Sequence, residues 1–167
     1  MACEAYVSSY CNNHGIEGYI VRPANVIGAR GRHGVTWDFI NKLKKNPTEL
    51  EVLGDGMQRK SYIHVSDGVD GFFQCMKKTS KKVEIYNLGS EDSVDVMSIA
   101  KIVVKNMNLE NAKIRTTGGV DGGRGWIGDI KQAHLDITKL KGVGWSPKLS
   151  SAESVDLASK ELQNDLI

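Results

Sequence analysis

The sequence predicts an α/β fold. Apolar runs of strand length alternate along the chain with segments in which apolar residues recur every three to four positions, a pattern typical of a parallel or mixed sheet covered by helices. Glycine accounts for 18 of the 167 residues, above its usual share of roughly 7%, which indicates many tight turns. This length is sufficient for one domain with a real hydrophobic core.

The first half of the chain is predicted to contain two helices and three strands. Residues 2–14 are predicted to be helical, with one apolar face made by Ala2, Ala5, Tyr6 and Tyr10. The elements that follow are a strand at 18–22, a loop at 23–33, a helix at 35–45, and two strands at 50–53 and 58–65. The turn 54–56 joins the last two strands, so they are expected to form a hairpin-like unit.

The second half is predicted to alternate strands and helices in the same way. Its elements are strands at 83–88 and 113–117, helices at 66–76, 96–107 and 150–162, a glycine-rich stretch at 118–125, and a short helix from Asp136 to near Gly142. Ser66 is expected to cap the helix that contains Val69, Phe72, Phe73 and Met76, and Asp95 to cap the next one. A capping box, Ser150 to Glu153, opens the last helix, whose buried face is Val155, Ala158 and Leu162.

The composition excludes several classes of protein. The 22 Lys and Arg residues nearly balance the 20 Asp and Glu residues, so the net charge is only +2 and no basic surface for nucleic acid is expected. No run of about 20 apolar residues could span a membrane, and no secretory signal is visible. The four histidines and three cysteines lack the spacing of metal ligands. The odd number of cysteines favours reduced thiols and a cytoplasmic location.

Residues 119–125 match the spacing G-x-x-G-x-x-G after a predicted strand. A dinucleotide-binding loop of this kind runs into a helix, whose N-terminal amides hold the pyrophosphate. Here Trp126 and Ile127 follow, with no helical periodicity. The segment is therefore interpreted as a flexible loop. The four lysines within 77–82 are likewise interpreted as a solvated helix end.

Asn25 follows a buried strand and a proline-fixed turn, in the segment Arg22-Pro-Ala-Asn-Val-Ile-Gly. This turn delivers Asn25 to the carboxyl edge of the sheet, where α/β proteins bind ligands. Asn can donate and accept hydrogen bonds there, and Gly28 would allow the backbone to approach a ligand closely. An Asn that only stabilises the turn explains the pattern equally well.

Arg59 and Lys60 are adjacent cations in the strand at 58–65. Strand alternation places them on opposite faces, so one of them is expected to meet an anionic ligand and the other to meet solvent. Arg124 and Asp129 in the later loop could complete a clamp for phosphate and ribose. Ordinary surface charges are the alternative explanation.

Four motifs in order resemble a known family: Arg22-Pro-Ala-Asn-Val-Ile-Gly, the stretch from Gly54 to Asp67, Tyr86-Asn-Leu-Gly-Ser, and Leu140-Lys-Gly-Val-Gly-Trp-Ser-Pro. Together they resemble the C-terminal half of extended short-chain dehydrogenase/reductases, the NAD-dependent nucleotide-sugar epimerases and dehydratases, and above all the UDP-glucose 4-epimerases. The resemblance covers essentially residues 1–167. It implies the last strands of a Rossmann-type sheet, interleaved with a small α/β substrate-binding domain.

The N-terminal half of that family has no counterpart in the sequence. The family's glycine-rich NAD loop and its Tyr-x-x-x-Lys pair are absent, and residues 1–4 resemble the stretch directly after that lysine. The sequence is therefore expected to correspond to a family member that starts just past its catalytic lysine. The resemblance implies NAD for the full-length family. No catalytic residue and no retained NAD are expected for this chain.

The resemblance assigns contacts with the substrate or the cofactor to five positions. Pro23 matches the position beside the nicotinamide, and Asn25 matches an asparagine that contacts the sugar-nucleotide pyrophosphate. Glu51 and Leu53 match strand positions that line the uracil, and Val94 matches a position near the nucleoside.

Two further positions depart from the family pattern, and a third residue is expected to compensate for one of them. Lys60 stands where the family usually has a phosphate-binding arginine, so the bidentate geometry of that contact is lost. Trp126 occupies another usual arginine position, and Arg124, two residues earlier, is expected to reach the same phosphate.

The resemblance predicts the substrate-binding half of a nucleotide-sugar 4-epimerase, with a UDP-sugar as ligand and a homodimer as assembly. Neither nucleic acid nor a membrane is expected as a partner. Two alternatives stay open: a non-catalytic module that binds nucleotide sugars or another protein, and part of a sugar-nucleotide dehydratase or reductase.

Overall fold

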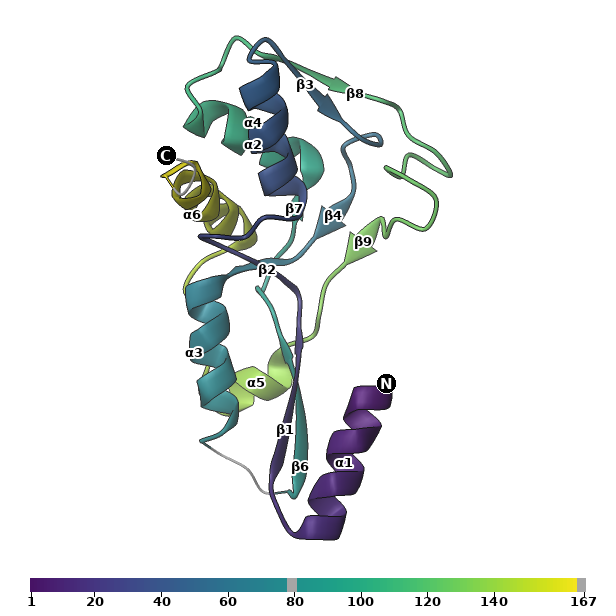
Figure 1. Cartoon of the computed structure of the whole chain (residues 1–167), viewed down its shortest axis with the longest axis vertical. Helices are drawn as coiled ribbons and strands as arrows, with labels where there is room; N and C mark the ends of the chain where they lie inside the picture. The colour runs from purple at the N-terminus through teal and green to yellow at the C-terminus, as the bar shows by residue number, and fades with distance from the viewer. Residues whose placement is uncertain (78–80, 165–167) are drawn as a thin grey trace.

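The computed structural model describes residues 1–77 and 81–164, so part of the lysine run at 77–82 lies outside the described residues. In chain order the elements are α1 (Ala2–His14), β1 (Gly18–Pro23), β2 (Asn25–Ile27), α2 (Val35–Lys45), β3 (Glu49–Val52), β4 (Arg59–Lys60), β5 (Tyr62–His64), α3 (Val65–Cys75), β6 (Val83–Leu88), β7 (Val94–Asp95), α4 (Val96–Asn106), β8 (Lys113–Thr116), β9 (Gln132–Ala133), α5 (Thr138–Gly142) and α6 (Ser151–Asn164). The molecule is elongated, with α2, α4, α6, β3 and β8 at one end and β1, β6, α1, α3 and α5 at the other (Figure 1).

The strands pair mostly in parallel, which confirms the predicted α/β class. β1 pairs with β6, β2 with β5, and β3 with β8, each in parallel. The central strand β4 pairs in parallel with β9 and antiparallel with β7, so this sheet is mixed. Parallel neighbours need long crossover connections, and the helices supply them.

Three predictions about strands are wrong. The segment 23–33 is not only a loop, because Asn25–Ile27 forms β2 against β5. The single strand predicted at 58–65 is split into β4 and β5, which belong to different sheets. The hairpin-like unit does not form, because β3 pairs with β8 rather than with the strand that follows it. The two-residue strands β7 and β9 have too few residues to show an alternation in the sequence.

Two apolar cores hold the ends of the molecule together. One lies among α2, α4, α6 and β3 and is built on residues such as Phe39, Leu50, Ile99 and Val155. The other packs Tyr86 and Leu88 of β6 against Leu140 and Trp145. The predicted buried face of the last helix is confirmed, since Val155, Ala158 and Leu162 are all buried.

Two of the three predicted helix caps are confirmed. The Asp95 carboxylate accepts a hydrogen bond of 2.8 Å from the Ser98 amide. Ser150 and Glu153 form a reciprocal capping box, in which the Ser150 amide donates to Glu153 Oε2 (2.8 Å) and the Glu153 amide to Ser150 Oγ (3.2 Å). Ser66 is not the cap of α3; His64 is, and its Nδ1 accepts from the Ser66 amide at 3.3 Å. The cap lies two residues earlier than predicted, because an imidazole can accept there as well as a hydroxyl.

Replacing the Asp95 cap tests this assignment. Burial raises the pKa of Asp95, but hydrogen bonds from the amide and hydroxyl of Ser98 outweigh it, so the pKa lies below its ordinary value of 3.8. We expect Asp95→Ala to lower the free energy of unfolding by about 1 kcal/mol at neutral pH, the usual cost of a lost cap. Asp95→Asn, which keeps an accepting oxygen, should lose less. Urea denaturation measures both.

The depressed pKa also fixes the pH dependence of this contribution. A carboxyl whose pKa is lowered by folding stabilises the folded state above its ordinary pKa, and this stabilisation disappears as pH falls through the folded value. The difference in unfolding free energy between the wild type and Asp95→Asn should therefore shrink on acidification. A difference that is constant with pH would contradict the role of the charge.

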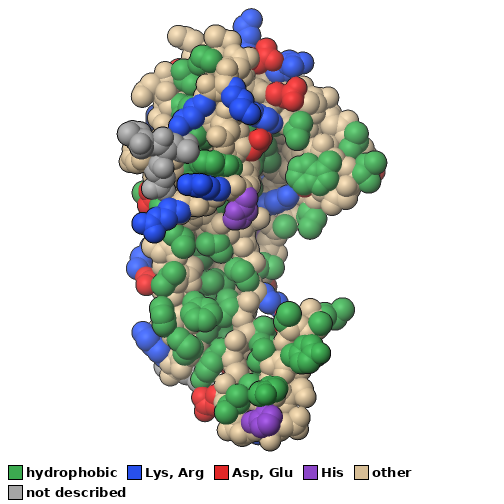
Figure 2. Space-filling model, viewed as in Figure 1, with side chains coloured by type: hydrophobic (Ala, Val, Ile, Leu, Met, Phe, Trp, Pro, Cys, Tyr) green, Lys and Arg blue, Asp and Glu red, His purple; other side chains and the backbone are tan. Residues whose placement is uncertain are grey.

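The helices α1 and α3 turn apolar side chains outward (Figure 2). On α1, the side chains of Tyr6 and Tyr10 are 75% and 62% exposed, while Cys11 is buried. On α3, the four residues Val69, Phe72, Phe73 and Met76 are exposed. The face that α3 turns inward carries Gly68, Gly71, Asp67 and Cys75 instead. A Cβ at Gly71 would lie 2.4 Å from Leu88 Cδ1, so glycine lets the helix approach β6 closely.

Candidate functional site

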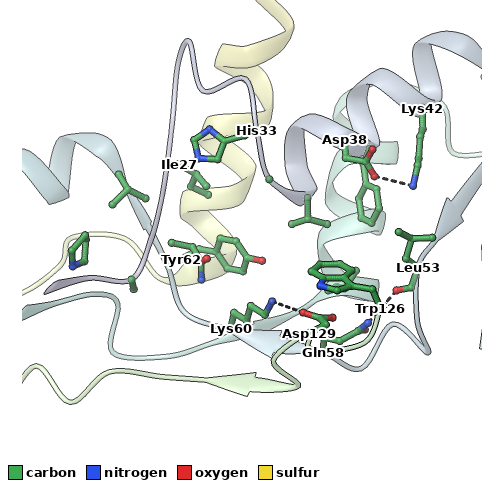
Figure 3. A pocket seen from close by; sticks show the side chains of 18 residues that line it. Ile27, His33, Asp38, Lys42, Leu53, Gln58, Lys60, Tyr62, Trp126 and Asp129 are labelled. Carbon is green, nitrogen blue, oxygen red and sulfur yellow. Dashed lines mark hydrogen bonds and ion pairs between the residues drawn. The ribbon is translucent and has the colours of Figure 1, made fainter. Parts of the chain in front are cut away.

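A cavity of about 1060 Å³ opens at the carboxyl end of β1, between α2 and the loop that precedes β9 (Figure 3). Clefts at the carboxyl ends of parallel strands are the usual ligand sites of α/β proteins. Its lining comes from five segments of the chain and comprises Pro23, Ala24, Asn25, Val26, Ile27, His33, Gly34, Val35, Asp38, Phe39, Lys42, Leu53, Gln58, Lys60, Tyr62, Val96, Trp126 and Asp129.

Five of the eight residues proposed as site residues line this cavity: Pro23, Asn25, Leu53, Lys60 and Trp126. The other three lie outside its lining. Glu51 is directed to β8, where its carboxylate pairs with Arg115 at 3.4 Å. Val94 is buried in the core beside α4. Arg124 is held by its own loop, as described below.

Lys60 and Asp129 form the main ion pair of the cavity. Lys60 Nζ lies 2.9 Å from Asp129 Oδ1, and the side chains are 22% and 3% exposed. Asp129 Oδ2 also accepts from the Gly125 amide at 3.3 Å. Burial raises the pKa of Asp129, but hydrogen bonds from Lys60 and the Gly125 amide outweigh it and hold the pKa below its ordinary value. The carboxylate is therefore charged at neutral pH.

Arg59 and Lys60 diverge as strand alternation predicts. Lys60 lines the cavity, whereas Arg59 donates to the Ser93 carbonyl at 2.7 Å and pairs with Asp95 at 3.2 Å. One of the two cations thus faces the cavity, and its neighbour supports β7.

The loop that carries Trp126 supplies the open side of the cavity. Trp126 is 56% exposed, and Lys60 Nζ lies 5.9 Å from the centre of its ring. Arg124 Nε donates to the backbone carbonyl of Asp129 at 3.0 Å, and its guanidinium also pairs with Asp121 at 3.3 Å. Arg124 therefore stabilises the loop in the structure and does not line the cavity.

Asn25 lines the cavity and also stabilises the local backbone. Its amide nitrogen donates to the Ser61 carbonyl at 2.9 Å, which ties β2 to the link between β4 and β5. Gly28, in contrast, is not a point of ligand approach. A Cβ there would lie 2.5 Å from Val65 Cγ1, so the close contact that requires glycine is with α3.

Several lining residues have no counterpart in the sequence-based prediction. Asp38 and Lys42 on α2 pair at 2.8 Å, one helical turn apart. Tyr62 is buried, and this burial together with the charge of Asp129 raises its pKa to about 12. Gln58 is buried too, and its side-chain nitrogen donates to the Leu53 carbonyl at 3.1 Å. The spacing of Asp38, Phe39 and Lys42 on one helical face is a signal that could have identified the α2 contribution.

The N-terminus of α2 also lies at the cavity. Gly34 and Val35 line it, and no side chain among the described residues accepts a hydrogen bond at this cap. The preceding glycines, Gly28, Gly31 and Gly34, have the spacing G-x-x-G-x-x-G and run directly into the helix. This feature was missed by sequence reasoning. Unpaired amides at the start of a helix favour anions.

The other glycine-rich segment is a loop, as predicted. Val120 and Arg124 exchange backbone hydrogen bonds of 2.9 and 2.8 Å, and the residues after Gly125 form turns rather than a helix. This segment therefore does not provide the phosphate-binding loop that a dinucleotide such as NAD requires. Within residues 1–77 and 81–164 there is no cluster of three or more His, Cys, Asp or Glu side chains arranged to hold a metal ion. A search of the same residues finds no helix of the length and apolarity needed to cross a membrane.

Comparison with known proteins gives the family of the chain. It is similar to a solved UDP-galactose 4-epimerase, with 38% identity, a TM-score of 0.85, and coverage of 98% of this chain and 52% of that one. It is also similar to a UDP-glucose 4-epimerase of Thermotoga maritima solved with UDP-glucose, with 25% identity, a TM-score of 0.80 and coverage of 99% and 52%. A human dTDP-D-glucose 4,6-dehydratase is 27% identical over 155 residues, which are 92% of this chain and 44% of that protein.

The chain spans about half the length of the curated relatives it matches. Residues 1–89, more than half of the 167, match the family model described as the NAD dependent epimerase/dehydratase family. The predicted resemblance and the Rossmann-like α/β fold are confirmed by these matches. The chain belongs to the NAD dependent epimerase/dehydratase family.

Proposed function

We propose that this chain, residues 1–167, is the substrate-binding half of a nucleotide-sugar 4-epimerase of the UDP-glucose type. The observation that carries the proposal is the cavity at the end of β1, in which Asn25, Lys60 and the N-terminus of α2 come together. An amide, an ammonium group and unpaired helix amides suit a diphosphate. The apolar walls at Leu53, Phe39 and Trp126 suit a base or a sugar ring.

In this proposal, different residues of the cavity contact different parts of the ligand. Lys60 and Asn25 would meet the diphosphate, Leu53 and Trp126 would pack on the ring systems, and Pro23 would face the cofactor side. Glu51 and Val94, which the resemblance places near the nucleoside, would act through the strand and core that support the cavity. Arg124 would act by shaping the Trp126 loop. The solved relative from T. maritima contains UDP-glucose, which supports this choice of ligand class.

Binding and activity assays on the 167-residue chain test the proposal. We expect calorimetry to show binding of UDP and UDP-glucose. We also expect no NAD to be released when the purified chain is denatured, and no conversion of UDP-galactose, because the chain lacks the Tyr-x-x-x-Lys pair and residues 118–125 form no dinucleotide loop. Stoichiometric NAD in the denatured supernatant would contradict the second expectation, and absence of UDP binding would contradict the proposed function.

A dehydratase-type ligand is the second candidate, and one observation favours it. The human protein named dTDP-D-glucose 4,6-dehydratase is 27% identical over 92% of this chain. The same calorimetry with dTDP in place of UDP separates the two. If dTDP binds more tightly than UDP, the chain is better described as part of a dehydratase. If neither nucleotide binds, a module that interacts with another protein is favoured.

We propose a homodimer and a reducing, cytoplasmic compartment for the protein. Tyr6 and Tyr10 form an exposed apolar face on α1, and such faces mark interfaces. The three cysteines are free thiols, of which Cys11 and Cys75 are buried. Burial raises the pKa of Cys75, which keeps that thiol protonated and unreactive.

A further inference from the structure

Every lysine that lines the cavity already has a carboxylate partner on the cavity wall. Lys42 pairs with Asp38 at 2.8 Å and Lys60 with Asp129 at 2.9 Å, and these four are the charged Lys, Arg, Asp and Glu side chains of the lining. The side chains of the cavity are therefore balanced in charge. A diphosphate brings at least two negative charges, so it must compete for a lysine that is already paired.

Asp129 is the fixed member of its pair. Its side chain is 3% exposed, and Oδ2 is held by the Gly125 amide at 3.3 Å. The carboxylate therefore stays in place when Lys60 moves.

Lys60 is the member that can move. An ammonium group has three donors on a flexible stem, and the carboxylate of Asp129 uses one of them. Its position 5.9 Å from the Trp126 ring gives the cation a second favourable surface toward the cavity. Lys42, in contrast, is bound both to Asp38 and to the Glu51 carbonyl at 3.2 Å.

We propose that Asp129 competes with the diphosphate of the ligand for the Lys60 ammonium, and that this competition limits the affinity of the site for nucleoside diphosphates. The inference rests on the proposed function, because it takes the cavity as the nucleotide site. Binding then exchanges one ion pair for another. The carboxylate left behind lies close to the incoming phosphate and repels it.

Neutralising Asp129 tests the competition. UDP and uridine are titrated by calorimetry into the wild type and Asp129→Asn at the same ionic strength. We expect Asp129→Asn to bind UDP about three- to fivefold more tightly, the size of a partly screened ion-pair contribution. Uridine has no phosphate, so its change in affinity measures any effect of Asp129 on the nucleoside, and the gain for UDP should exceed it. Asp129→Ser, which removes the charge and keeps a polar oxygen, serves as a second variant if the amide disturbs folding, and thermal melting of each variant checks this.

Asp55→Asn is the matched control. Asp55 pairs with Lys131 beside the same loop, but neither residue lines the cavity. The Asp55→Asn substitution removes a carboxylate charge as Asp129→Asn does, but it does not affect the partner of Lys60. The affinity for UDP should therefore equal that of the wild type. An equal gain in this control would show a general field effect and overturn the proposal.

The outcomes separate the two levels of inference. If Asp129→Asn and Asp129→Ser bind UDP more weakly than the wild type, or equally, Asp129 does not compete and the inference fails while the proposed function stands. If neither the wild type nor any variant binds UDP, the proposed function fails together with the inference. UDP binding by the wild type that tightens in the Asp129 variants, and not in Asp55→Asn, supports both.

Discussion

Lys60→Ala is expected to weaken UDP binding by about 10- to 100-fold, because a hydrogen bond to a charged group contributes about 1.5–3 kcal/mol. Lys60 is the cation of the cavity whose partner can be exchanged, and Asp129 lies 2.9 Å from it. Removing the ammonium leaves the Asp129 carboxylate without its counter-charge at the place where the phosphate must bind. The variant therefore loses the attraction of the ammonium, while the repulsion between Asp129 and the phosphate remains. Calorimetry at fixed salt measures the change.

Two neighbouring substitutions control this prediction. Arg59→Ala removes the adjacent cation, which points to Asp95 rather than into the cavity, and should leave UDP affinity unchanged. Lys60→Arg restores the guanidinium that the family usually carries and should bind at least as tightly as the wild type, since a planar fork can hold two phosphate oxygens. If Lys60→Ala and Arg59→Ala behave alike, Lys60 is a surface charge and not a ligand contact.

The second large effect concerns assembly. We expect light scattering at micromolar concentration to give about twice the chain mass of 18.3 kDa for the wild type. The double variant Tyr6→Lys/Tyr10→Lys should give the mass of a single chain, because it places two charges on the exposed face of α1. Burying a charge in an interface without a partner costs several kcal/mol, enough to dissociate a dimer of moderate affinity.

The exposed face of α3 provides the matched control for assembly. Phe72 and Phe73 are exposed like the two tyrosines, on the opposite side of the β1–β6 pair (Figure 1). Phe72→Lys/Phe73→Lys should leave the dimer intact if α1 forms the interface. A monomer in this variant and a dimer in the α1 variant would move the interface to α3. A single-chain mass for the wild type would refute self-association.

Local signals in the sequence predicted many of the helices and where they begin. The bounds of α1 and α2 agree with the predicted segments 2–14 and 35–45. The Asp95 cap and the Ser150–Glu153 box are present with the expected partners. These features depend on residues within one or two turns of each other, so a short stretch of sequence contains both the donor and the acceptor.

The candidate site was predictable only in part. Asn25 and Lys60 were identified from a strand end and from alternation, and both line the cavity. The α2 contribution was not predicted, because the glycines at 119–125 have the same spacing as those at 28–34. Of these two segments, only residues 28–34 run directly into a helix. The start of a helix was thus the deciding signal, and it was present in the sequence.

The sequence by itself determined the α/β class, the positions of α1, α2 and α6, and the buried face of α6. Only the tertiary structure decided which strands pair and which charges meet. Residues 58–65 form two strands because β4 pairs with β7 and β9, whereas β5 pairs with β2. Lys60 meets Asp129 across 69 residues of chain. The physical reason is that helix periodicity and caps are interactions between near neighbours, whereas the partner of a strand or a buried charge is chosen by the packing of the whole fold.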